Sequence, residues 1–292
     1  MKLRFSLLGW VWVVGFFLVG CQPAPATVQE SSPTPLPSWV PLTVTAISTE
    51  TASPSFTPTG TSTPIPPTPT LTPALSICSP LEGYSLGQMA GLVSNPFHPP
   101  LPGSDDPHQA VDLADRQPDS QIALAGRVVQ AVLGGGVAAV IQDRFPYGNA
   151  LLVETPLEGL PNSLPAALGL TEPASTPIPN LALTCPDVVQ KNWKAGQSLY
   201  LLYAHLQQAP TFLPGDPITC GQAIGIVGDS GNALNPHLHL EVRLGPSGVR
   251  FSSLAHYDNS ATLEEMDNYC TWRVRGVFRL VDPMRLLGLS GR

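Results

Sequence analysis

The chain has 292 residues, which is long enough for one or two domains. Only 12% of the residues are charged, and the formal net charge is −7. This acidic balance argues against a protein that neutralises nucleic-acid phosphates or binds membranes through a basic face, so we expect no nucleic-acid partner.

The N-terminal segment has the features of an export signal. Lys2 and Arg4 precede an uncharged run over 5–20, which is shorter than the about 20 residues that a spanning helix needs. The run ends in LVGC, which resembles the lipobox of bacterial lipoproteins, whose cysteine is lipidated. We therefore expect residues 1–20 to be a lipoprotein signal peptide and Cys21 to carry the lipid; a plain secretory signal or an uncleaved anchor is the alternative.

Each of these interpretations takes the rest of the chain out of the cytoplasm. A lipid on Cys21 would attach the protein to a membrane of the cell envelope, facing the periplasm or the cell exterior. Residues 21–77 would then be a linker, because 22–77 contain 13 prolines and 21 Ser or Thr but no Lys or Arg. Such a segment buries too little apolar surface to offset backbone ordering, so we expect a disordered tether.

Residues 78–292 are predicted to form one β-rich domain. Short β-branched runs between glycines and prolines predict strands, at 126–133, 137–142, 150–154, 198–206, 222–228 and 237–243. Their spacing favours an antiparallel sandwich or barrel over parallel βαβ units. One or two short helices are expected, at 261–269 and 282–288. Residues 156–197 have no clear period and predict a long insertion between two strands, which is either functional or disordered. A functional insertion could wall, narrow or cover a groove, and the sequence does not decide between these roles.

Four cysteines lie in this domain: Cys78, Cys185, Cys220 and Cys270. An even number in an exported domain predicts at least one disulfide, and three pairings are open. Cys78 and Cys270 lie near the two ends of the domain, which makes that pair the first guess, although spacing cannot establish it. No CxxC motif is present, so we do not expect a cysteine zinc site.

Four of the six histidines are the candidates for the chemistry, and they occur in three motifs: HQAVD with His108 and Asp112, LYAHL with His205, and HLHLE with His237 and His239. On a strand, alternate side chains share a face, so His237, His239 and Glu241 should point the same way. Glu241 could then orient His239 from behind. By the same rule Tyr203 should share the face of His205.

A zinc site is the chemistry that these residue types predict. On a flat strand His108 and Asp112 would be about 13 Å apart, too far for one zinc, so the chain must bend after Pro107. With His239 they would form three protein ligands and leave a fourth position for water, whose pKa zinc lowers toward about 7. His205 and His237 would remain to accept a proton and to stabilise a developing oxyanion.

These motifs, in this order, resemble the lysostaphin-type (LytM-like) zinc metallopeptidases, which cleave peptide bonds in bacterial cell-wall peptidoglycan. The resemblance covers about residues 103–243, with a VDP segment at 281–283. The matching stretches are HQAVD (108–112), ALAGRV (123–128), PYGNALLVE (146–154), LYAHL (202–206), GDPITCGQAIGIVGDSG (215–231) and PHLHLEVR (236–243). The resemblance implies that His108, Asp112 and His239 hold zinc, and that His205 and His237 are catalytic.

The resemblance also implies a fold and an activity. The fold would be a two-layer antiparallel β-sandwich with the metal in a groove on one sheet. The activity would be a zinc-dependent endopeptidase that cuts peptidoglycan peptides with zinc-activated water, acting from its lipid anchor as a monomer. A catalytically silent scaffold of the same fold, which binds wall or activates an amidase, is the alternative, and a zinc buffer is a third. The scissile bond stays open between D,D-cross-links and glycine bridges.

Overall fold

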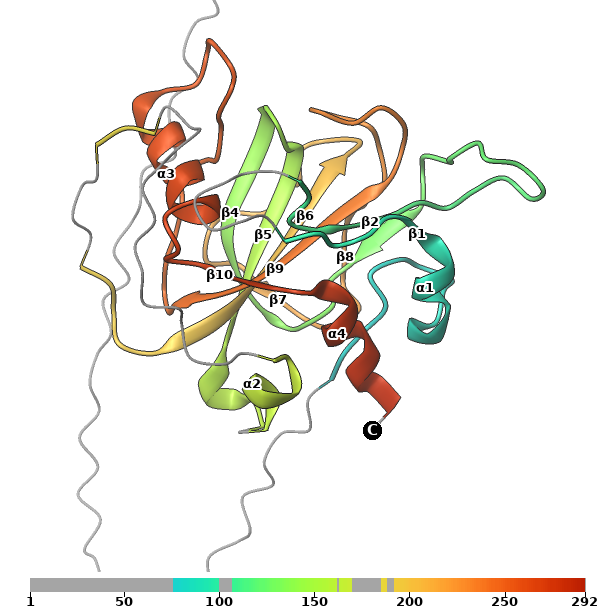
Figure 1. The fold of residues 1–292 in the computed structure, drawn as a ribbon, viewed down its shortest axis with the longest axis horizontal. Helices are drawn as coiled ribbons and strands as arrows, with labels where there is room; N and C mark the ends of the chain where they lie inside the picture. Colours follow the sequence, from blue (N-terminus) through green and yellow to red (C-terminus); the bar gives the residue numbers. More distant parts are fainter. Residues whose placement is uncertain (1–75, 100–106, 162, 170–184, 188–191, 292) are drawn as a thin grey trace, which may run out of the picture. The chain divides into compact units, whose positions relative to one another are not determined.

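A computed structural model describes residues 76–99, 107–161, 163–169, 185–187 and 192–291 (Figure 1). The expected signal peptide 1–20, the lipidated Cys21 and nearly all of the linker 21–77 lie outside the described residues. None of the helices that the structure describes is both long and apolar enough to span a membrane.

The strands within this described part are β1 (Val93–Asn95), β2 (Val111–Leu113), β3 (Val128–Gln130), β4 (Gly135–Arg144), β5 (Gly148–Pro156), β6 (Gln197–Leu206), β7 (Pro217–Ile218), β8 (Ala223–Ile226), β9 (Leu238–Pro246) and β10 (Arg279–Val281). The helices are α1 (Met89–Leu92), α2 (Leu164–Ala167), α3 (Leu263–Arg273) and α4 (Pro283–Leu287), with 3-10 turns η1 (Leu86–Gln88), η2 (Leu157–Gly159) and η3 (Gly288–Gly291).

The strands form an eight-stranded sheet and a two-stranded sheet. The large sheet has the order β1-β2-β9-β6-β5-β4-β7, with β10 also paired to β9, and the small sheet pairs β3 with β8. Every pairing is antiparallel. The prediction of a strand-rich, two-layer antiparallel fold with few short helices is therefore confirmed.

The two faces of the large sheet bury different side chains. One face supplies Leu199, Leu201 and Tyr203 of β6 to a core that also contains residues of β3, β8, α1 and α4. The other face supplies Tyr200 and Leu202 to an aromatic cluster with residues of α3 and of the 249–254 segment. In Figure 1, α3 accordingly lies on the opposite side of the sheet from α1 and α4.

The longest strands and both expected helices lie where the sequence predicted them. Helix α3 starts at a capping box, in which the Thr262 hydroxyl accepts from the Glu265 amide and the Glu265 carboxylate accepts from the Thr262 amide. In α4 the carboxylate of Asp282 caps the first turn, and Pro283 occupies the first helical position. The short strands β1, β2, β7 and β10 were not predicted, because two or three residues carry no periodicity of their own.

Two disulfides join distant parts of the domain. Cys78 pairs with Cys220, and Cys185 pairs with Cys270. The expectation of at least one disulfide is borne out, whereas the guess that Cys78 pairs with Cys270 is wrong. Closeness to the chain ends does not predict the pairing, because the two cysteines lie on different faces of the large sheet. Cys270 lies on α3, which packs on the aromatic face, where its partner is Cys185. Cys78 lies on the side of β3, where its backbone amide donates to the Val132 carbonyl.

Candidate metal and catalytic site

The register of the large sheet brings the candidate ligands together. β2 pairs with β9 so that Asp112 lies opposite His239, and β9 pairs with β6 so that His239 lies opposite Ala204. β1 extends the same row, because Asn95 pairs with Asp112. Directly opposed residues of antiparallel strands share a face, so this row projects its side chains from one side of the sheet.

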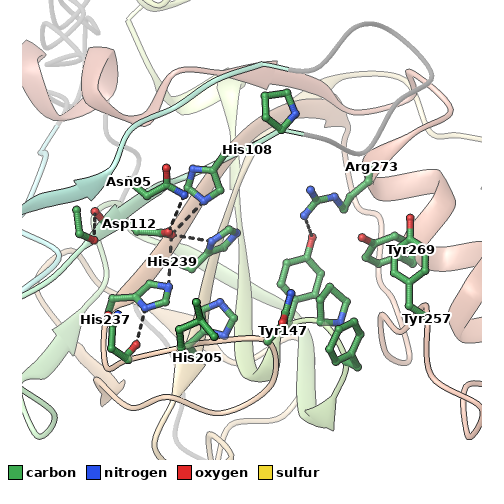
Figure 2. Close-up of a pocket in the computed structure, with 17 residues that line it drawn as sticks. Asn95, His108, Asp112, Tyr147, His205, His237, His239, Tyr257, Tyr269 and Arg273 are labelled. Carbon is green, nitrogen blue, oxygen red and sulfur yellow. Dashed lines mark hydrogen bonds and ion pairs between the residues drawn. The ribbon is translucent and has the colours of Figure 1, made fainter. Parts of the chain in front are cut away.

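Three imidazoles surround one carboxylate oxygen, Asp112 Oδ1 (Figure 2). His239 Nδ1 lies 2.9 Å from it, His108 Nε2 lies 3.2 Å from it, and His237 Nε2 lies 3.6 Å from it. The ring of His205 completes the group, with its centroid 4.8 Å from that of His237 and 5.3 Å from that of His239. The structure thus gathers all five residues that the sequence singled out.

The chain bends after Pro107, as predicted. His108 forms an isolated bridge with His98 through two backbone hydrogen bonds, and β2 begins only at Val111. The two residues between are bends, so His108 and Asp112 approach each other instead of lying a strand's length apart.

His205 reaches the site because its strand is bulged. Between Tyr203 and Leu206 the pairing with β5 gains one residue, and His205 adopts a left-handed φ of 61°. A bulge turns a side chain that regular alternation would send to the opposite face. The expectation that Tyr203 shares the face of His205 is therefore wrong: Tyr203 is fully buried in the other core, where its hydroxyl accepts a hydrogen bond from the Val132 amide.

Each imidazole has one ring nitrogen held from behind. Nδ1 of His108, His205 and His237 lies 3.0, 2.7 and 2.8 Å from the carbonyl oxygens of Pro96, Ser230 and Asn235, respectively. His239 is reversed, since its Nδ1 faces Asp112 and its Nε2 lies 3.2 Å from Glu241 Oε1. Such contacts fix the tautomer and orientation of metal-binding histidines.

The 229–231 loop that holds His205 is itself tightly packed. A Cβ on Gly148, whose φ is +65°, would lie 2.4 Å from the Ser230 carbonyl carbon, so only glycine fits there. The Ser230 hydroxyl donates to the Leu206 carbonyl and accepts from the Asn149 amide. This packing places the Ser230 carbonyl oxygen against the His205 ring.

The electrostatics of the group differ from residue to residue. Burial acts to raise the pKa of Asp112, but hydrogen bonds from His108 and His239 outweigh it and hold that pKa far below its usual range. Burial also acts to lower the pKa of His239, yet hydrogen bonds with Asp112 and Glu241 raise it to about 9. For His205, burial and the nearby charges of His239 and His237 lower the pKa to about 3, so its ring is neutral at pH 7.

Glu241 occupies the position predicted for it behind His239. Its side chain is fully buried, and its Oε1 accepts hydrogen bonds from the Tyr147 hydroxyl at 2.8 Å and from Arg273 Nη1 at 3.0 Å. Burial would raise its pKa, but the charges of Arg243 and Arg273 and the contact with His239 hold it well below its usual range. Glu241 is therefore an ionised partner fixed against the back of the His239 ring.

A cavity of about 430 Å³ opens over the group, and all five candidate residues line it. Its far wall was not predicted: it carries Tyr147, Tyr257, Tyr269 and Arg273, which Figure 2 shows on the side away from Asp112. Tyr147 falls in the matching PYGN stretch, which was a usable signal, whereas nothing in the sequence connected the residues of α3 and its preceding loop to the histidines. Among the described residues of the insertion 156–197, none lines this cavity.

Two overlapping sets of side chains have the spacing of metal ligands. One is His108, Asp112 and His239, and the other is His205, His237 and His239; in each set the ligand atoms lie within 4.8 Å of one another. The first set contains a carboxylate held in its ionised form together with two imidazoles, and nitrogen and carboxylate oxygen are donors that zinc takes. The donor set of the described residues therefore fits zinc.

A third cluster of this kind, which contains Cys185, Cys270 and His256, is explained by the disulfide between its two cysteines. It offers no thiolate to a metal.

Comparisons with known proteins agree with the motifs. Residues 188–251, which include His205, His237 and His239, match the sequence model of Peptidase family M23. No curated protein matches the chain.

Solved structures with a detectable likeness include the catalytic domain of lysostaphin from Staphylococcus simulans, with 17% identity, 70% of this chain and 98% of that one covered, and a TM-score of 0.36. A mutant catalytic domain of the prophage-encoded M23 protein EnpA from Enterococcus faecalis has 19% identity, coverages of 60% and 88%, and a TM-score of 0.31. A zinc-containing peptidase from Vibrio cholerae has 19% identity and a TM-score of 0.31; it covers 59% of this chain, which spans only 37% of that protein. With the family match over 188–251, the chain resembles the lysostaphin-type peptidases of family M23, as its motifs predict.

Proposed function

We propose that this protein is a zinc-dependent endopeptidase that cleaves peptide bonds of bacterial peptidoglycan. The observation that carries the proposal is the convergence of His108 Nε2 and His239 Nδ1 on Asp112 Oδ1, with His205 and His237 beside them in one open cavity. The family match over 188–251 supports a peptidase acting on cell wall.

In this proposal His108, Asp112 and His239 hold the zinc. When bound there, zinc supplies a Lewis acid that polarises a peptide carbonyl and lowers the pKa of water. His205, whose Nδ1 is held by the Ser230 carbonyl, presents its other nitrogen to the cavity and accepts the proton that the attacking water loses. His237, whose Nδ1 is held in the same way by the Asn235 carbonyl, would donate through Nε2 to the carbonyl oxygen as negative charge develops on it, in the form of the ring that carries a proton on both nitrogens.

Location and attachment complete the proposal. The LVGC motif supports a lipid on Cys21, and the Pro/Ser/Thr-rich segment 21–77 would let the domain 78–292 act on wall at a distance from the membrane. The protein would work as a monomer in the cell envelope, facing the periplasm or the exterior.

The experiment is a comparison of His108→Ala and His205→Ala in the purified full chain, because the two possible ligand sets differ in these residues. Zinc content is measured by elemental analysis, and cleavage by mass spectrometry of peptidoglycan fragments. We expect His108→Ala to lose zinc and cleavage, and His205→Ala to keep zinc but lose cleavage. The exposed His98, replaced by Ala, is the control and should change neither.

Other outcomes would change the assignment. Loss of zinc from His205→Ala with zinc retained in His108→Ala would transfer the metal to the three-histidine set. Zinc binding without cleavage by the unaltered protein would overturn the peptidase proposal and favour a silent scaffold of the same fold.

A further inference from the structure

Helix α3 carries none of the five candidate residues, yet side chains of its last turn contact Glu241, the carboxylate next to His239. Trp272 is fully buried, and its Nε1 donates to Glu241 Oε2 at 2.9 Å. Arg273 Nη1 donates to the other oxygen, Oε1, at 3.0 Å. Two successive residues of α3 therefore hold the two oxygens of one buried carboxylate.

That carboxylate is the group behind His239. Glu241 Oε1, which accepts from Arg273, is also the atom 3.2 Å from His239 Nε2, and the opposite nitrogen of the same ring lies 2.9 Å from Asp112. A rotation of the Glu241 side chain would move the hydrogen-bond partner that sets the plane of the His239 ring. Trp272 and Arg273 of α3 are therefore connected to the candidate ligand His239 through a single residue, Glu241.

Residues of the sheet secure the two oxygens unequally. Arg243, which neighbours Glu241 on the same strand face, donates to Oε2 through both Nε and Nη2. Oε1 instead receives the Tyr147 hydroxyl, and Arg273 Nη1 also donates to that hydroxyl at 3.2 Å. The oxygen that faces His239 thus depends on Arg273 directly and through Tyr147.

Trp272 holds the Glu241 carboxylate both directly and through Arg243. The Arg243 guanidinium lies over the Trp272 ring, 4.7 Å from its centroid, so the indole supports Arg243 as well as donating to Glu241. The ring also packs edge-on or tilted against Tyr200, Phe251 and Phe278. These contacts leave little freedom for the indole donor to move.

The helix is fixed at several points along its length. The capping box closes its start, and the disulfide from Cys270 ties the turn before Trp272 to Cys185, in the segment that leads to β6. A rigid second layer is what a metal ligand needs for a defined orientation. We propose that α3 is a built-in clamp for the zinc site, and that Trp272 and Arg273 are positioning residues that set the orientation of His239 through Glu241.

This inference rests on the proposed zinc site and is tested by metal affinity. The full chain is prepared unaltered and as Trp272→Phe, Arg273→Met and Arg273→Lys, and its zinc dissociation constant is measured by competition with a chromogenic chelator. We expect Trp272→Phe and Arg273→Met each to weaken zinc binding by about 10- to 100-fold, as loss of an outer partner does elsewhere. Arg273→Lys keeps a cationic donor and should recover part of the loss.

Tyr200→Phe is the matched control. It removes a buried hydroxyl from the same aromatic cluster, but that hydroxyl bonds to Glu154 and to the Pro246 carbonyl instead of Glu241. It should therefore leave the zinc dissociation constant unchanged, and thermal unfolding of the metal-free proteins reports any general loss of stability.

The possible results distinguish failure of the clamp proposal from failure of the proposed peptidase function. Wild-type zinc affinity in Trp272→Phe and Arg273→Met, with zinc-dependent cleavage by the unaltered protein, would overturn the clamp and leave the peptidase intact. An equal loss of affinity in Tyr200→Phe would also overturn the clamp, because it would reduce the effect to general destabilisation. No zinc binding by the unaltered protein would overturn both.

Discussion

Two buried carboxylates lie on the same face of the large sheet, on either side of β6, and only one of them serves the candidate site. Glu241 of β9 pairs with Leu202, and Glu154 of β5 pairs with Tyr200. Both are almost completely inaccessible, and both are held by arginine and tyrosine, since Glu154 accepts from Arg250 and from the Tyr200 hydroxyl.

The difference lies in the neighbours. Two residues before Glu241 on the same strand face is His239, which Glu241 touches, whereas Glu154 binds the Ser198 hydroxyl and the Gly248 amide instead. Arg250, the ion-pair partner of Glu154, has a side chain that is 40% exposed, whereas the arginine partners of Glu241 are buried. A buried carboxylate that accepts several hydrogen bonds therefore occurs at two places in this sheet, and Glu241 differs from Glu154 in contacting a histidine of the candidate metal site.

The largest expected effect comes from Glu241→Gln. The change leaves Arg243 and Arg273, 0% and 9% exposed, without their counter-ion. Removing one member of a buried ion pair costs about 3–5 kcal/mol. Urea unfolding should show that loss, and zinc affinity should fall with it.

Glu154→Gln is the paired variant. Water can solvate the half-exposed Arg250, so the loss should be about 1–2 kcal/mol, with zinc affinity unchanged. Equal losses of stability and zinc affinity in the two variants would refute the distinction between the two carboxylates.

The two disulfides extend the comparison. Replacing Cys185 and Cys270 by Ala removes the bond that fixes α3, and replacing Cys78 and Cys220 removes a bond on the opposite face. Each double variant should lose about 2–4 kcal/mol of stability, because each bond closes a long loop. Only the first should also weaken zinc binding. If the second variant weakened zinc binding as much, rigidity of α3 would not be the cause.

Some features of the candidate site could be predicted from the sequence because they depend on the local geometry of one strand. Alternation along HLHLE places His237, His239 and Glu241 on one face, because a regular strand has a fixed period. The bend at His108 follows from distance alone. These two predictions depend only on local geometry, and the positions of the side chains in the structure agree with them.

Other features depend on pairing and could not be predicted. The bulge that turns His205 into the cavity exists only because β6 gains a residue against β5, so a flat strand placed Tyr203 on the wrong face. Trp272 and Arg273 follow Glu241 by about thirty residues, with no periodic relation to it, and only the packing of α3 brings them beneath the site. The disulfide pairing depends on the same packing.

The smallest expected effect is the acid sensitivity contributed by Glu154. Burial acts to raise its pKa, but the hydrogen bonds from Arg250, Gly248 and Ser198 outweigh it and lower that pKa below its usual value. A carboxyl whose pKa is lower in the folded state than in the unfolded chain adds stability at neutral pH and loses that contribution as the pH falls through the folded pKa.

The stability difference between the wild type and Glu154→Gln should therefore shrink as the pH falls below the usual glutamate pKa of 4.5 and through the lower pKa of the folded state. Urea unfolding at a series of acid pH values measures it, and Asp119→Asn, which removes an exposed carboxylate elsewhere, is a control for the general loss of charge. A constant difference across the range would mean that Glu154 titrates alike in the folded and unfolded chains. Its hydrogen-bond donors would then hold the carboxyl group in place without favouring its ionised form. Glu154 and Glu241 would share a buried, hydrogen-bonded position but not a stabilised negative charge.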